Sequence, residues 1–236
     1  MLTIGARIVF LLDVDNTLLD NDRFSADLDA RLTQSLGADA HASYRELYES
    51  LRKQRGYADY LSPLQEMRNT FDGDPDLLDL AQFMLEYPFA SNAYPGVRET
   101  LAHLSTLGLT TILSDGDLVL QPRKIRHSGL WDAVQGRVLV YLHKELRLAA
   151  MQERFPAGHY VAVDDKPHVL AAIKSSMGAK VTTIFIRQGH YATQATVDAS
   201  QPPPDMQFNH IAELQTLTLE RLQPPAIPVA TLKEIP

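Results

Sequence analysis

The sequence predicts an α/β protein in which a doubly wound parallel sheet carries an inserted domain made only of helices. Short apolar runs typical of buried strands alternate with helical segments along the second half of the chain, and this alternation indicates a parallel sheet. Three of the runs end in acidic or hydroxyl-bearing turns. A long stretch behind the first run has helical spacing throughout and shows no strand pattern.

The chain has the composition of a globular protein. Its 236 residues are 45% apolar and 22% charged, which suits one domain or a core domain with a smaller insert. The net charge of −7 disfavours nucleic acid as the main partner, because such binding needs a basic face. No cysteine is present, so a metal would need oxygen or imidazole ligands. We expect no signal peptide or membrane span, and hence a cytoplasmic location, since the first apolar run is short and ends at Asp13.

The first predicted strand covers residues 8–12 and leads directly into two aspartates. Five apolar residues in a row indicate a strand buried on both faces. Asp13 and Asp15 are two apart, so in an extended chain their side chains point the same way and repel each other. Protonation of one, or a bound cation, relieves the repulsion. An ionised carboxylate can then attack while a protonated one acts as a general acid, although a solvated turn also fits the dipeptide.

Residues 20–93 are predicted to form the helical insert. Apolar residues three and four apart, punctuated by glycine and proline, indicate four helices at residues 25–36, 42–55, 64–70 and 76–86. One helical face carries two tyrosines and two leucines, which favours packing over a substrate site: Tyr44, Leu47, Tyr48 and Leu51. The arginines of the same segment fit a solvated face, with an anion site as the alternative.

The rest of the chain predicts the remaining sheet. Four further strands are expected at residues 110–113, 138–141, 160–163 and 181–186, separated by helices at 97–107, 122–128, 144–155 and 167–177. After these come a loop, one more surface helix and an extended or disordered tail, at residues 202–204, 210–222 and 223–236. We therefore expect a core domain from two pieces of the chain, residues 1–19 and 94–222, around the insert at 20–93.

Polar groups from three strand ends are expected to meet at one edge of the sheet, because parallel strands present their carboxyl ends together. The residues concerned are Asp13 and Asp15 from the first strand, Ser114 from the second, and Asp164 and Asp165 from the fourth. Ligands bind at this edge in doubly wound proteins. The convergence is a stronger signal than any single motif.

Some of these assignments have structural alternatives. Ser114 suits an ordinary turn or helix cap. The adjacent acids after the fourth strand need a positive partner, and Lys166 is a candidate. A lysine is also expected at the edge. Lys144 opens the helix before the fourth strand, whereas Lys124 is a rival in the wrong segment.

Four segments, in order, resemble the motifs of the haloacid dehalogenase-like superfamily over about residues 8–190. The stretch DVDNTLLD is similar to the first motif, and VAVDDKPHVL to the acidic fourth motif in its variant with two neighbouring acids. Ser114 matches the second motif. Lys144 matches the lysine of the third, although Glu145 follows it where proline is frequent in the family. The resemblance implies a Rossmann-like core with a helical cap inserted after the first strand.

The resemblance also implies a magnesium-dependent phosphatase that hydrolyses a small-molecule phosphate monoester through an aspartyl phosphate. Asp13 would be the nucleophile, and Asp15 the general acid and then the general base. The phosphoryl group would be bound by Ser114, Lys144 and the backbone of Asp115 and Gly116. Mg²⁺ would be held by the carboxylates of Asp13 and Asp165 and the carbonyl of Asp15, with Asp164 in a supporting position.

Other activities stay open. A phosphomutase of the β-phosphoglucomutase type would use the same carboxylates, and a catalytically silent binding or regulatory module would keep only the fold. Haloacid dehalogenation is disfavoured, because displacing halide needs no proton donor at the position of Asp15. Phosphonate hydrolysis needs a lysine from the insert, where Lys53 is the only one. The sequence does not choose among sugar phosphates, nucleotides and other small esters, or indicate an oligomeric state.

Overall fold

The computed structural model describes residues 6–194 and 201–222. In this part of the chain six strands form one parallel sheet in the order β3-β2-β1-β4-β5-β6. Their bounds are Ala6–Leu12 (β1), Leu109–Asp115 (β2), Val138–Tyr141 (β3), Ala157–Asp164 (β4), Val181–Ile186 (β5) and Met206–Phe208 (β6). The chain winds outward from β1 in both directions, so the predicted doubly wound sheet is confirmed.

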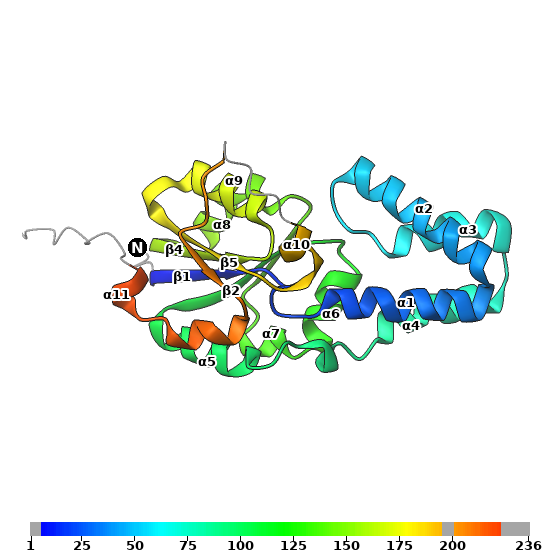
Figure 1. Ribbon diagram of the computed structural model, residues 1–236, viewed down its shortest axis with the longest axis horizontal. Coiled ribbons are helices and arrows are strands. Elements are labelled where there is room, and N and C mark those ends of the chain that lie inside the picture. Colours follow the sequence, from blue (N-terminus) through cyan, green and yellow to red (C-terminus); the bar gives the residue numbers. More distant parts are fainter. Residues whose placement is uncertain (1–5, 195–200, 223–236) are drawn as a thin grey trace, which may run out of the picture.

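Helices cover both faces of the sheet (Figure 1). Side chains of β1 alternate between two apolar clusters, with Ile8, Phe10 and Leu12 in one and Val9 and Leu11 in the other. None of the five is more than 2% exposed, so this strand is buried on both faces, as predicted. The first cluster includes α5 (Val97–Leu107), α6 (Leu120–His127) and α7 (Leu130–Ala133), and the second α8 (Leu148–Arg154) and α9 (Pro167–Met177).

The stretch between β1 and α5 contains four helices, as predicted. They are α1 (Asn21–Leu36), α2 (Ala38–Arg55), α3 (Leu61–Phe71) and α4 (Pro75–Glu86). An apolar cluster of their own, around Phe24, Tyr44 and Tyr60, is distinct from the two clusters of the sheet. Figure 1 shows these helices extending beyond the sheet instead of covering it. Tyr44 and Tyr48 are 0% and 6% exposed and belong to this cluster, so the predicted packing is confirmed for the two tyrosines, while Leu47 and Leu51 are half-buried. The bounds of this helical insert as a domain, 20–93, stay a prediction.

Capping explains why α1 begins four residues earlier than predicted. Asn16 has a φ of 58°, and its side-chain oxygen accepts hydrogen bonds from the backbone N–H groups of Asn21 (3.0 Å) and Asp22 (3.2 Å). Asp20 accepts another from the N–H of Arg23 (2.9 Å). These bonds satisfy the N–H groups that the first turn of a helix leaves without a partner. The motif loop after β1 thus directly starts the first helix of the insert.

The chain after β5 differs from the prediction. A sixth strand, β6, was not expected, and it pairs with β5 where Asp205 accepts hydrogen bonds from the backbone N–H and hydroxyl of Thr183 (2.8 and 3.0 Å). The single surface helix expected at residues 210–222 is wrong. A 3₁₀ helix (η4, Ile211–Thr216) and a short α11 (Leu219–Leu222) replace it, and Ile211 is fully buried in the sheet's first apolar cluster. Residues 202–204 form the predicted loop. The expected tail from residue 223 lies outside the described residues.

Several short elements complete the fold. Three 3₁₀ helices, η1 (Phe89–Asn92), η2 (Lys144–Leu146) and η3 (Gly178–Lys180), and the short α10 (Gly189–Gln194) connect the larger ones. The helix predicted at residues 144–155 is therefore split into η2 and α8, and the backbone N–H of Lys144, at the start of η2, donates to the Asp115 carboxylate (2.7 Å). Within the described ranges no helix combines the length and apolar character needed to cross a membrane.

Candidate active site

Three strands end at one edge of the sheet with the polar residues predicted for it. The register between β1 and β4 places Leu12 opposite Val163, so the residues that follow emerge side by side. Asp13, Ser114 and Asp164 lie within this edge and are 3%, 1% and 2% exposed. Three polar side chains buried together at a strand edge need partners among themselves or in a ligand.

Asp13 is the most surrounded of these groups. Its Oδ1 lies 2.5 Å from the ammonium of Lys144 and 3.5 Å from the hydroxyl of Ser114, and its Oδ2 accepts a hydrogen bond from Thr17 (3.3 Å). Burial alone would raise the pKa of Asp13, but the positive charges of Lys144 and Lys166 outweigh burial and lower it. The carboxylate is therefore kept ionised, as a nucleophile needs to be.

Lys144 joins two of the strand ends. It is 1% exposed, and its Nζ lies 2.5 Å from Asp13 and 2.6 Å from Asp164. Although burial opposes the charged form, these carboxylates and that of Asp115 raise the pKa of Lys144 well above its usual value. The pairing also shows that Lys144, rather than Lys166, is the ion-pair partner of Asp164.

Asp165 differs from its neighbour in having no hydrogen-bond partner among the described residues, although the charge of Lys166 acts on it. Both of its carboxylate oxygens are buried and receive no hydrogen bond from the part of the chain that the structure describes. Burial and the adjacent charge of Asp164 raise the pKa of Asp165 well above its usual value. A buried carboxylate without a partner is costly, so its presence points to a positive ligand.

The acidic residues at this edge fit a divalent cation. Asp13, Asp164 and Asp165 each offer one carboxylate oxygen, and these oxygens lie within 4.8 Å of one another. An all-oxygen donor set is what Mg²⁺ prefers, and the unpartnered oxygens of Asp165 would gain a ligand. We conclude that the residues present fit a magnesium ion.

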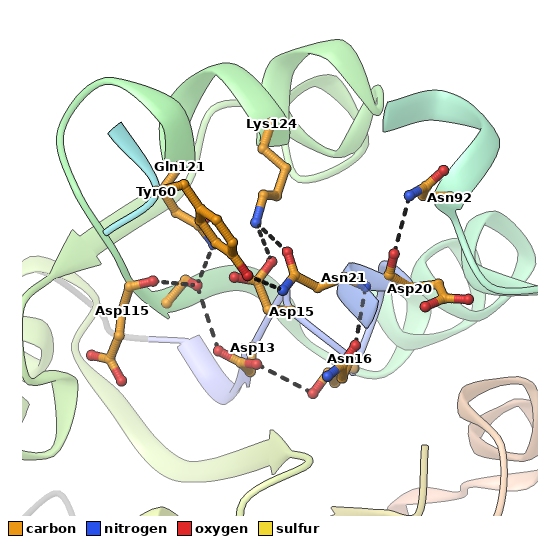
Figure 2. Close-up of polar contacts among 12 residues, drawn as sticks. Asp13, Asp15, Asn16, Asp20, Asn21, Tyr60, Asn92, Asp115, Gln121 and Lys124 are labelled. Carbon is orange, nitrogen blue, oxygen red and sulfur yellow. Dashed lines mark hydrogen bonds and ion pairs between the residues drawn. The ribbon is translucent and has the colours of Figure 1, made fainter. Parts of the chain in front are cut away.

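Helix α6 approaches the site closely and contributes a residue that the sequence did not suggest. Gln121 is 3% exposed and donates a hydrogen bond from Nε2 to the Ser114 hydroxyl (2.9 Å; Figure 2). The approach requires Gly116, because a Cβ there would lie 2.7 Å from the Cβ of Gln121. The N–H of Gly116 donates to the carbonyl of Tyr141 (2.9 Å), so its predicted use for phosphate binding is not supported.

A second lysine reaches the site from the same helix. Lys124 is 1% exposed, and its Nζ lies 2.7 Å from Oδ1 of Asp15 (Figure 2). By its position in the sequence this lysine lies in the wrong segment for the expected site, but the fold brings it there. It is three residues after Gln121, and residues three apart share one face of a helix, so α6 aims both side chains at the edge. Asp13 and Asp15 thus each have their own lysine.

A cavity of about 450 Å³ opens beside Asp15, between the helical insert and the sheet. Asp15 and Lys166 line it from the sheet, Tyr48 and Arg52 from α2, and Tyr191 from α10. Arg52 and Lys166 lie 5.6 and 5.3 Å from the centre of the Tyr191 ring. A cavity of this size and lining suits a small polar molecule.

The fold and this edge define a hydrolase of the haloacid dehalogenase type, and comparisons with known proteins agree. A family model described as haloacid dehalogenase-like hydrolase matches residues 9–176, and the chain belongs to this family. A structure from Burkholderia xenovorans, described as that of a haloacid dehalogenase-like hydrolase, is 52% identical. The similarity covers 89% of this chain and 98% of that one, with a TM-score of 0.85.

More distant structures share the fold. The L-2-haloacid dehalogenase of Xanthobacter autotrophicus is 18% identical with a TM-score of 0.57, over 89% of this chain and 96% of that one. A HAD-hydrolase of Bacillus subtilis, described as bound to magnesium, is 16% identical with a TM-score of 0.60, over 88% and 96% of the two chains. None of the curated proteins compared with the sequence matches it.

Proposed function

We propose that the protein is a magnesium-dependent phosphatase that hydrolyses a small phosphate monoester through an aspartyl phosphate on Asp13. The observation that carries the proposal is the separate pairing of the two carboxylates. Asp13 is buried against Lys144, while Asp15, at the cavity, is held by Lys124. An ionised carboxylate in the first position suits nucleophilic attack, and a second carboxylate facing the substrate suits proton transfer.

The chain's own residues account for both halves of the reaction. Asp13 attacks phosphorus, and the bond to the leaving oxygen breaks as Asp15 protonates that oxygen. Asp15, now ionised, takes a proton from water, which attacks the aspartyl phosphate and releases inorganic phosphate and Asp13. Lys144 and Ser114 orient the phosphoryl oxygens. Asp13, Asp165 and the carbonyl of Asp15, with Asp164 in support, would hold Mg²⁺, which would supply the positive charge that lets an anionic nucleophile approach an anionic ester.

The competing activities explain less of the site. A dehalogenase releases halide, which leaves without a proton, so Asp15 and the buried lysine that holds it would have no task. Phosphonate hydrolysis would need a lysine of the insert, but Lys53 is exposed and does not line the cavity beside Asp15. A silent binding module would have no reason to keep the unpartnered carboxylate of Asp165 buried.

The proposal is tested by measuring phosphate release from p-nitrophenyl phosphate with Mg²⁺ and with EDTA. We expect turnover with Mg²⁺, none in EDTA and none for Asp13→Asn. The matched control is Asp79→Asn, because Asp79 is an exposed aspartate of α4 that lines no cavity at the site. It should keep native activity.

Three results would contradict the proposal. Absence of turnover, together with a melting temperature that Mg²⁺ does not change, would remove the metal site and favour a binding module. Halide release from a 2-haloacid without phosphatase activity would favour the dehalogenase. For a phosphomutase, an added sugar phosphate should return as its positional isomer with little free phosphate.

A further inference from the structure

We propose that Lys124, together with Asn21 and Tyr60, positions the Asp15 carboxylate, so that the seating of the helical insert on the sheet sets the direction in which Asp15 delivers its proton. The inference rests on the proposed phosphatase function and goes beyond it, because it assigns a task to residues outside the four motifs. Figure 2 shows these side chains meeting above Asp13.

Lys124 is a buried charge with two hydrogen-bond partners. Its Nζ donates to Oδ1 of Asp15 (2.7 Å) and to Oδ1 of Asn21 (2.8 Å), and the residue is 1% exposed. A buried ammonium is stable only when its hydrogen bonds are satisfied. The position of Lys124 and the orientation of Asp15 are therefore mutually dependent.

Three aromatic rings of the insert lie around the ammonium of Lys124. Nζ of Lys124 lies 5.7 Å from the ring centre of Phe24, 6.0 Å from that of Tyr60 and 5.6 Å from that of Phe89. All three rings belong to the apolar cluster of the insert and are at most 4% exposed. Ring faces attract a cation within this range, so the insert helps to hold the ammonium beside Asp15.

A chain of hydrogen bonds leads from Lys124 into the insert. Asn21, the first residue of α1, accepts from Lys124 and donates from Nδ2 to the Tyr60 hydroxyl (3.0 Å). The carbonyl of Tyr60 in turn accepts from the hydroxyl of Tyr44 in α2 (2.8 Å). A displacement of α1 or of the segment before α3 would pull on Asn21 and hence on Lys124. The carboxylate of Asp15 thus senses where the insert lies.

These contacts fix how the Asp15 carboxylate is oriented. Its Oδ1 is occupied by Lys124, while Oδ2 has no hydrogen bond within residues 6–194 and 201–222. The side chain is 21% exposed and lines the cavity between insert and sheet. Because Oδ1 accepts a hydrogen bond from the ammonium, the proton that Asp15 delivers has to be carried by Oδ2, which is left to face a leaving group. Without Lys124 the carboxylate would rotate among several orientations, few of which are productive.

The test compares two aryl esters of nearly the same shape. The p-nitrophenolate anion leaves without a proton, whereas phenolate from phenyl phosphate is a poorer leaving group and depends on the general acid. The measured quantity is kcat/KM, which reports formation of the aspartyl phosphate. For Lys124→Met we expect kcat/KM to fall about tenfold more with phenyl phosphate than with p-nitrophenyl phosphate. Lys124→Arg, which keeps the charge, should recover part of this difference.

A double-mutant cycle separates positioning from a general loss of stability. Asp15→Asn alone should change the ratio of the two kcat/KM values at least as much as Lys124→Met. If Lys124 acts through Asp15, adding Lys124→Met to Asp15→Asn should leave the ratio unchanged. Tyr60→Phe removes only the hydroxyl at the far end of the network and should change the ratio in the same direction but less. It carries the test if Lys124→Met does not fold.

The control is Lys174→Met, which removes a partly buried lysine from its ion pair with Asp205 (2.7 Å), away from the site. It should lower the melting temperature without changing the ratio. If the native chain hydrolyses both esters and Lys124→Met lowers kcat/KM equally for the two, the inference is overturned and the phosphatase proposal stays intact. A native chain that hydrolyses neither ester overturns both.

Discussion

The two lysine–carboxylate pairs of the site differ in what surrounds them. Lys144 lies between Asp13 and Asp164, which are both at most 3% exposed at the sheet edge. Lys124 lies between the sheet and the insert, where its partner Asp15 is 21% exposed. The proposed nucleophile is thus paired with a lysine within the rigid sheet edge, whereas the proposed proton donor is paired with a lysine that also contacts the insert.

The largest expected effect comes from removing the lysine of the rigid pair. Lys144→Met leaves two buried carboxylates without their cation, which typically costs about 3–5 kcal/mol of unfolding free energy. In kcat we expect a loss of about a thousandfold, because an electrostatic contact to the phosphoryl group disappears as well. Unfolding in urea and steady-state kinetics check both. The contrast between the two pairs would fail if Lys124→Met lowered both the unfolding free energy and kcat more than Lys144→Met does.

The next effect concerns the unpartnered acid. If Asp165 holds the proposed Mg²⁺, the native chain should melt at a higher temperature with Mg²⁺, by an amount that at a hundred times the dissociation constant corresponds to about 2.7 kcal/mol, and Asp165→Asn should abolish this rise. In EDTA the variant should be at least as stable as the native chain, because a buried charge beside Asp164 is removed. Thermal unfolding with and without Mg²⁺ measures this. A variant that still responds to Mg²⁺ would exclude Asp165 as a ligand.

A smaller effect should follow from moving α6. Gly116→Ala places a Cβ 2.7 Å from that of Gln121, so the helix has to shift, with an expected cost of about 1–3 kcal/mol. Because α6 carries both Gln121 and Lys124, activity toward phenyl phosphate should fall more than activity toward p-nitrophenyl phosphate. Gly73→Ala is the control for backbone strain alone, since Gly73 has a φ of 77°, which also strains an alanine, but a Cβ there would meet nothing within 4 Å. Equal losses for the two esters would show that the shift does not reach Asp15.

The smallest effect lies near the amino end of β4, away from the site. His159 is 2% exposed, its Nε2 lies 2.9 Å from the hydroxyl of Thr182, and burial together with the charge of Lys174 lowers its pKa. The unfolded chain therefore binds a proton below about pH 6.5 that the folded chain does not, so stability falls as the pH drops through this range. The slope is at most about 1.4 kcal/mol per pH unit.

His159→Gln should flatten this pH dependence between about pH 5 and 7 while leaving activity at neutral pH unchanged. Urea unfolding at several pH values measures the slope. An unchanged slope would mean that other groups carry the proton uptake. The result would sharpen the contrast between an amino edge that affects only stability and a carboxyl edge that affects activity.

The local pattern of the sequence was enough to predict five of the six strands of the sheet and the position of its polar edge. From Ile8 to Leu12 β1 is apolar without interruption because both of its faces are buried there, and this pattern is visible without any tertiary information. The order of the strands and helices then places Asp13, Ser114 and Asp164 at one edge. The four helices of the insert follow from local spacing in the same way, although their first turns depend on caps such as Asn16.

Only the tertiary structure decided which side chains complete the site. Gln121 and Lys124 reach it because α6 docks with one particular face toward β1 and β2, and the rotation of a helix against a sheet is not encoded in its local spacing. Likewise β6 depends on the contact between Asp205 and Thr183, which are far apart in the chain. Local patterns determine elements through burial, whereas partners depend on distances that exist only after the chain has folded.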